Sequence, residues 1–124
     1  MSRPTPMNRS IKTAKISLRV LLDDEIAIGP GKADLLEGIE ETGSIAAAGR
    51  RMKMSYKRAW TLVETMNACF RGPLVETSKG GAARGGAALT PLGEDVLSRY
   101  RSMESAAKSA VQKEMAKLKS MLAD

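Results

Sequence analysis

The spacing of apolar residues near the N-terminus of this 124-residue chain predicts a short β-hairpin. Ile16, Leu18, Val20 and Leu22 occupy every second position, which is typical of a strand with one buried face. The acidic stretch 23–25 predicts a turn, and 26–28 a shorter returning strand. Residues 1–12 before the hairpin are polar and predict a flexible basic arm.

The spacing becomes helical after the Gly-Pro-Gly sequence at 29–31. Gly43 lies where a first helix is expected to stop, because glycine readily adopts the left-handed conformation that ends many helices. Ser44 and Ser55 are good N-caps for a second helix at about 45–52 and a third at about 56–70. Each expected helix has an apolar face: Leu35, Leu36 and Ile39; then Ile45, Ala48, Met52 and the following Met54; then Ala59, Val63 and Met66.

Small residues mark the place where the second and third helices are expected to cross. Ala48 and Gly49 lie on one helix and Ala59 on the other, so the two backbones can approach closely. Two short helices joined by a turn at Lys53-Met54 and crossing nearly perpendicularly form a helix-turn-helix. Trp60, at the edge of the inward face, is open to two interpretations: packing against the wing or first helix, or direct contact with DNA.

A two-stranded wing is expected directly after this helix pair. Strands at 74–77 and 87–89 flank a loop at 78–86 that contains four glycines together with Lys79 and Arg84. A loop with unobstructed backbone N–H groups can lie along phosphates or enter a minor groove. A nucleotide-binding loop is the rival interpretation, but the GxxxxGK[ST] order is missing and the loop precedes a strand.

The last expected helix is long and has an apolar stripe. Thr90-Pro91 is a strong helix start, and apolar residues recur every three or four positions from Val96 to Leu122. A helix longer than its own domain can cover is expected to pair with a second copy, giving a homodimer. The alternative is a helix that packs on its own domain to about residue 104 and then frays.

These elements predict a mainly α protein with small β elements (α+β): a winged helix-turn-helix with an N-terminal β-hairpin and a long C-terminal dimerisation helix. We expect a flexible arm at 1–12, a DNA-binding domain at 13–103 and an extension of the last helix at 104–124.

The net positive charge of the chain favours a polyanionic partner. Lys and Arg outnumber Asp and Glu by 20 to 14, for a net charge of +6. Five basic residues and no acid lie between Gly49 and Arg58, and a solvated basic face is the simpler alternative to DNA binding. The side chains expected to contact DNA are Arg50, Arg51, Lys53, Ser55, Tyr56, Lys57, Arg58, Thr61, Lys79 and Arg84.

The composition argues against an enzyme or a metal protein. The chain has no histidine, which removes the usual general base, the Ser-His-Asp triad and classical zinc sites. The single cysteine, Cys69, cannot form an internal disulfide and is expected to be a small buried side chain rather than a reactive thiol. No cofactor is expected. The N-terminus lacks the apolar run of a signal peptide and no segment could span a bilayer, so we expect a cytoplasmic protein without a membrane partner.

Three sequence motifs carry a family resemblance. Thr42 to Ile45 (TGSI), Ser55 to Trp60 (SYKRAW), and the glycine-rich wing between LVET and LTPLG resemble the N-terminal domain of the ModE family, molybdate-responsive transcription regulators with a LysR-type winged helix. The similarity covers roughly 16–103. It implies a homodimer that binds a palindromic operator in double-stranded DNA and controls genes for molybdate uptake or molybdenum enzymes.

The resemblance also bears on effector binding. Family members continue into paired molybdate-binding domains after the dimer helix, whereas this sequence stops at Asp124, so we expect no small-molecule effector on this chain. A protein–protein interaction module without operator specificity is the alternative function. A basic third helix and wing favour the DNA-binding interpretation over it.

Overall fold

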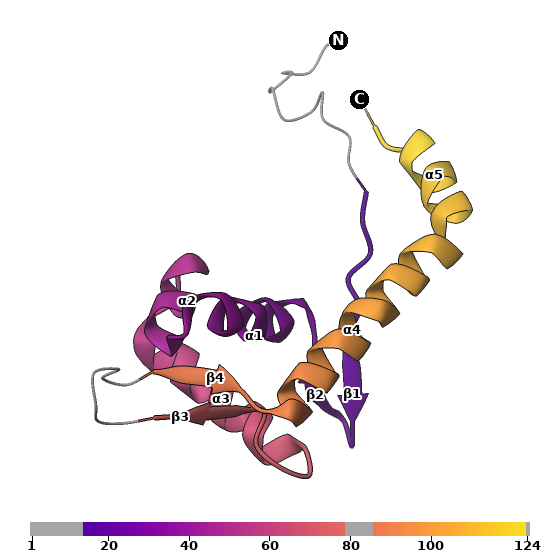
Figure 1. Cartoon of the computed structure of the whole chain (residues 1–124). Helices are drawn as coiled ribbons and strands as arrows, with labels where there is room; N and C mark the ends of the chain where they lie inside the picture. The colour runs from indigo at the N-terminus through magenta and orange to yellow at the C-terminus, as the bar shows by residue number, and fades with distance from the viewer. Residues whose placement is uncertain (1–13, 79–85, 124) are drawn as a thin grey trace.

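The computed structural model describes residues 14–78 and 86–123, which form a winged helix-turn-helix with a helical extension (Figure 1). The predicted fold class is thereby confirmed. In chain order the elements are β1 (Val20–Leu22), β2 (Glu25–Ile28), α1 (Pro30–Thr42), α2 (Ile45–Arg51), α3 (Tyr56–Cys69), β3 (Val75–Thr77), β4 (Ala87–Leu89), α4 (Pro91–Ala110) and α5 (Gln112–Ser120).

The N-terminal hairpin is confirmed but is shorter than predicted. β1 and β2 pair antiparallel across a turn in which Asp23 and Asp24 have φ of 53° and 69°, the positive values of the tight hairpin turn that follows strand twist. Glu25 belongs to β2, so its assignment to the turn is wrong. The strand predicted from Ile16 begins only at Val20, because β2 has just four residues and Gly29 then leads into α1.

Local sequence signals set the helix boundaries as predicted. Gly43 ends α1 with φ of 73°, and its N–H donates to the Ile39 carbonyl oxygen. Ser44 caps α2 by accepting from the Ala47 N–H, and Ser55 caps α3 by accepting from the Arg58 N–H, both at 3.0 Å. Each cap satisfies a backbone donor that the first helical turn leaves unpaired.

The core lies among α1, α2 and α3 and depends on two close backbone approaches. A Cβ on Gly38 would lie 3.0 Å from the Ala48 Cβ, and one on Gly49 would lie 3.0 Å from the Ala59 Cβ. Gly49 and Ala59 therefore mark the crossing of α2 and α3, as expected, whereas Ala48 lies at the crossing of α1 and α2. The apolar residues around them are fully or nearly fully buried: Leu35, Leu36, Ile39, Ile45, Val63 and Met66.

The wing strands pair antiparallel in the register Val75↔Leu89, Glu76↔Ala88 and Thr77↔Ala87. β4 is anchored to the junction of α1 and α2, because the Ala87 N–H donates to the Gly43 carbonyl oxygen at 2.9 Å. The predicted wing residues Lys79 and Arg84 lie outside the described residues, as does the arm at 1–12.

α4 packs against the domain at its start and then leads away from it. Gly93, Leu97 and Tyr100 are buried on α4, whereas Met103 is 44% exposed. The single long helix predicted is interrupted at Val111, which caps both α4 and α5. No described residue of α5 is buried, and Figure 1 shows α5 extending away from the helix-turn-helix.

None of the helices in the described part of the chain combines the length and apolarity needed to cross a membrane.

Candidate nucleic-acid interface

The first turns of α3 present a row of polar and basic side chains to solvent. Tyr56, Lys57, Arg58 and Thr61 are all exposed, while Ala59 is fully buried between them. Burial of one helix face orients α3 and leaves the predicted recognition residues outward. Among the described residues, none forms an ion pair with Lys57 or Arg58, so both charges remain available to a phosphate or a base edge.

Two aromatic rings meet on this helix. Tyr56 and Trp60 lie one turn apart, with ring centroids 6.2 Å apart and planes at 80°, the edge-to-face arrangement that aromatic pairs favour. Tyr56 is 57% exposed, whereas Trp60 is half-buried and packs against the core. Trp60 thus packs against the core and its ring supports the exposed Tyr56, while direct contact of Trp60 with DNA stays a prediction.

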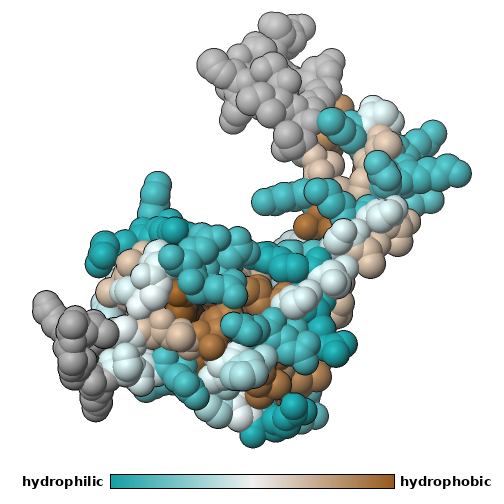
Figure 2. All heavy atoms as spheres, in the orientation of Figure 1, coloured by the Kyte–Doolittle hydropathy of each residue, from teal (hydrophilic) through white to brown (hydrophobic). Residues whose placement is uncertain are grey.

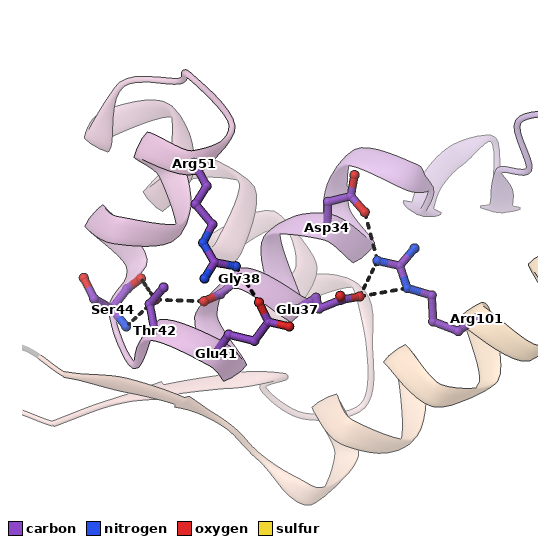
Figure 3. A network of polar contacts seen from close by, with 8 residues as sticks. All are labelled: Asp34, Glu37, Gly38, Glu41, Thr42, Ser44, Arg51 and Arg101. Carbon is purple, nitrogen blue, oxygen red and sulfur yellow. Dashed lines mark hydrogen bonds and ion pairs between the residues drawn. The ribbon is translucent and has the colours of Figure 1, made fainter.

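The basic residues of α2 and the following turn differ in their surroundings. Arg50 and Lys53 are exposed and form no ion pair within the described part of the chain. Lys53 has φ of 57°, an uncommon left-handed conformation that reverses the chain between the two helices. Arg51 is different, because its Nη1 donates to Glu41 Oε1 on α1 at 2.5 Å (Figure 3). No sequence pattern predicted this pair.

A side chain that the sequence did not single out as structural connects α3 to the wing. Asn67 Oδ1 accepts from the Leu74 N–H at 2.8 Å and the Val75 N–H at 3.2 Å, and Asn67 Nδ2 donates to the Val75 carbonyl oxygen at 3.2 Å. These three bonds fix the start of β3 relative to the recognition helix.

A second unpredicted cluster holds α4 against α1. Arg101 donates from Nη2 to Asp34 at 2.9 Å and to Glu37 at 2.7 Å, and from Nη1 to Glu104 at 3.0 Å (Figure 3 shows the contacts with α1). Burial lowers the pKa of the Arg101 guanidinium, but hydrogen bonds to the three carboxylates outweigh burial and raise that pKa above its ordinary value. The cluster sets the direction in which α4 leaves the domain.

Tyr100 makes a further link on the same helix. Its hydroxyl donates to the Leu18 carbonyl oxygen at 2.6 Å and so joins α4 to the segment before β1. Burial raises the pKa of the Tyr100 hydroxyl, with a smaller contribution from Glu104. The hydroxyl therefore remains a neutral donor under ordinary conditions.

Across residues 14–78 and 86–123, no group of three or more His, Cys, Asp or Glu side chains is arranged to hold a metal ion. The sequence predicted a small buried side chain at Cys69, but Cys69 is only half-buried. It lies in the last turn of α3, whose next residues lead to the surface-exposed Arg71.

Known proteins resemble the chain over most of these residues. The chain is 44% identical over 78 residues to the molybdenum-pterin-binding protein MopB of Rhodobacter capsulatus, a match that covers 63% of this chain and 29% of MopB. It is 38% identical over 94 residues to the transcriptional regulator ModE of Haemophilus influenzae, covering 76% and 37% of the two chains. It is 34% identical over 87 residues to the DNA-binding transcriptional dual regulator ModE of Escherichia coli, covering 70% and 33%.

Over the matched residues the chain resembles ModE-family regulators. No protein-family model matches the chain, and the resemblance rests on the identities to these relatives. The ModE-family resemblance expected from the sequence is thereby confirmed. The aligned part spans about a third of the length of the relatives, since it covers 29% to 37% of each.

Proposed function

We propose that this chain is a regulator of transcription that binds double-stranded DNA through α3 and the wing. The observation that carries the proposal is the exposed, basic first part of α3, where Lys57 and Arg58 project from a helix whose opposite face is buried. Residues near the N-terminus of a recognition helix are the ones that reach base edges in the major groove. The names of the relatives, which include a DNA-binding regulator, support this proposal.

The proposed roles follow from side-chain chemistry. Arg58 and Lys57 donate to guanine O6 and N7. The hydroxyls of Ser55, Tyr56 and Thr61 donate to phosphates or base edges, while exposed Arg50 and Lys53 contact phosphates. The Ser55 oxygen already accepts from the Arg58 N–H, which leaves its own hydrogen available as a donor. The wing loop 78–86 follows the backbone or minor groove through Lys79 and Arg84.

The C-terminal helices are proposed to join two copies. Leu118, Met121 and Leu122 are between 46% and 65% exposed, an amount of apolar surface that a lone domain does not need. An open groove of about 700 Å³ between 14–18 and the α4–α5 junction has several polar and charged lining residues, but Ile16, Leu18, Val111 and Met115 give it an apolar part. A partner helix laid along this groove would cover both apolar regions (Figure 2 shows this extension standing clear of the domain).

Selection from a random duplex library tests the proposal. A homodimer with two symmetry-related recognition helices selects a palindrome whose half-sites are a whole number of helical turns apart. A gel shift at physiological salt then measures preference for the selected sequence. Binding without any sequence preference would favour the alternative, a winged-helix module that contacts another protein.

The regulated genes are proposed from the relatives, whose names refer to molybdenum. We infer that the chain controls genes of molybdate transport or molybdenum enzymes. Deleting its gene should change transcript levels of those genes, measured with and without molybdate. Unchanged levels in both conditions would contradict this assignment without affecting the DNA-binding proposal.

A further inference from the structure

Arg51 is the one basic residue of the proposed DNA surface that a carboxylate already holds, within the described part of the chain. Its guanidinium contacts Glu41 Oε1, and the two side chains are 50% and 51% exposed. By contrast, Arg50, Lys53, Lys57 and Arg58 have no described carboxylate at ion-pair distance. The pair is therefore a feature of Arg51 and not of the basic surface in general.

The pairing is built by the junction of α1 and α2. Glu41 lies in the last turn of α1 and Arg51 in the last turn of α2, and the two helices approach closely at Gly38 and Ala48. Thr42 Oγ1 donates to the Gly38 carbonyl oxygen at 2.8 Å and accepts from the Ser44 N–H at 3.1 Å. These bonds fix the junction, and Figure 3 shows Arg51 reaching across it toward Glu41.

A carboxylate and a phosphate compete for the same guanidinium. Both present oxygen acceptors that a guanidinium binds with charge-assisted hydrogen bonds. A contact between arginine and a backbone phosphate carries no sequence information and adds affinity for every duplex. An exposed ion pair must be broken or weakened before Arg51 reaches a phosphate, and pairs of this kind correspond to about a 1.5- to 5-fold change in an equilibrium constant.

We propose that Glu41 is a positioning residue that competes with DNA for Arg51 and so lowers the affinity of this chain for duplexes of any sequence. This inference rests on the proposed DNA-binding function and adds an internal attenuator to it. Base contacts from Lys57 and Arg58 are unaffected, so the ratio between operator and random DNA is retained. As a result, the chain dissociates more readily from DNA that lacks the operator.

The test compares Glu41→Ala with Glu40→Ala in the full chain. Glu40 is an exposed neighbour on the same helical turn that pairs with no described basic residue, so both variants lose the same charge. Fluorescence anisotropy with a labelled random duplex, over a series of salt concentrations, measures affinity and its salt slope. We expect Glu41→Ala to bind about 1.5- to 5-fold more tightly than Glu40→Ala, with a salt slope steeper by up to about 0.9.

The Arg51→Ala background identifies the mechanism. There the advantage of Glu41→Ala over Glu40→Ala should disappear, because the charge that Glu41 holds is gone. Equal binding of the two variants with Arg51 present, or a persistent difference without Arg51, would overturn the proposal. If the unchanged chain bound no duplex, both this inference and the proposed function would fall.

Denaturation separates this effect from altered folding. Both single variants should unfold at similar urea concentrations, since an exposed pair contributes little to stability. Glu41→Gln, which keeps the side-chain shape, provides the measurement if Glu41→Ala folds poorly. The same tighter binding is expected from it, and its absence would overturn the proposal.

Discussion

Asn67 and Val75 exchange two hydrogen bonds, each of 3.2 Å, between the last turns of α3 and the first strand of the wing. The amide side chain of Asn67 thus makes the pair of hydrogen bonds to Val75 that a neighbouring strand would make. Because a third bond from the Leu74 N–H joins the same oxygen, the wing cannot move independently of the recognition helix at this point.

Asn67→Ala should therefore destabilise the domain by about 2–3 kcal/mol, because it leaves the buried N–H groups of Leu74 and Val75 without their acceptor. Urea denaturation followed by circular dichroism measures the loss. Thr65→Ala is the control, since Thr65 is exposed on the same helix and bonds only within it. Its effect should stay within about 0.5 kcal/mol. Similar losses in the two variants would contradict the role of Asn67.

Gly93→Ala should be more damaging, by about 3 kcal/mol or more. A Cβ at Gly93 would lie 2.1 Å from the Leu74 carbonyl oxygen, a backbone atom that Thr90 also holds in place. Gly31→Ala is the matched control on α1, where a Cβ meets nothing within 4 Å. It should stabilise the domain by about 0.5–1 kcal/mol. If Gly93→Ala unfolded at the same temperature as Gly31→Ala, the predicted clash with the Leu74 carbonyl oxygen would be contradicted.

Arg58→Ala and Lys57→Ala should each reduce discrimination for the selected operator by about 1–3 kcal/mol, because each removes a base contact. Competition between operator and random duplexes measures the discrimination. Lys113→Ala on exposed α5 removes the same charge far along the chain and should leave the operator preference unchanged. An unchanged preference in Arg58→Ala would rule out its reading of a base.

Lys79→Ala or Arg84→Ala in the wing should instead weaken binding to all duplexes alike. A lost phosphate contact lowers the salt slope by about 0.9 and leaves the operator preference intact. Affinity measured at several salt concentrations checks both points. A loss of affinity for the operator alone would show that the wing reads sequence.

Leu118→Glu should dissociate the proposed dimer, because it places a charge on the apolar side of α5 where 57% of Leu118 is exposed. Light scattering coupled to gel filtration measures the mass. Ser120→Glu adds the same charge to an exposed polar position and should keep the dimer. A monomer in the unchanged chain at micromolar concentration would show that α5 has another role.

The division between sequence and tertiary structure follows the range of the interactions. Helix starts at Ser44, Ser55 and Thr90 and the stop at Gly43 were predictable, because a cap bonds to a backbone group within a few residues of itself. The buried and exposed faces of α3 were predictable for the same reason, since the helical period places them. Two of the motifs that carry the family resemblance, at 42–45 and 55–60, lie on these local elements.

Contacts between distant residues could not be predicted in this way. Arg101 lies 67 residues from Asp34, and Tyr100 lies 82 residues from Leu18, so only the docking of α4 on the domain brings each pair together. The pairing of Arg51 with Glu41 likewise depends on how α1 crosses α2. The alternation of apolar residues predicted a first strand that is too long. A strand ends where its partner ends, and β2 ends where the chain enters α1. The sequence by itself determined the local elements and the basic face of α3, while only the tertiary structure decided that Arg51 on α2 is already held by a carboxylate.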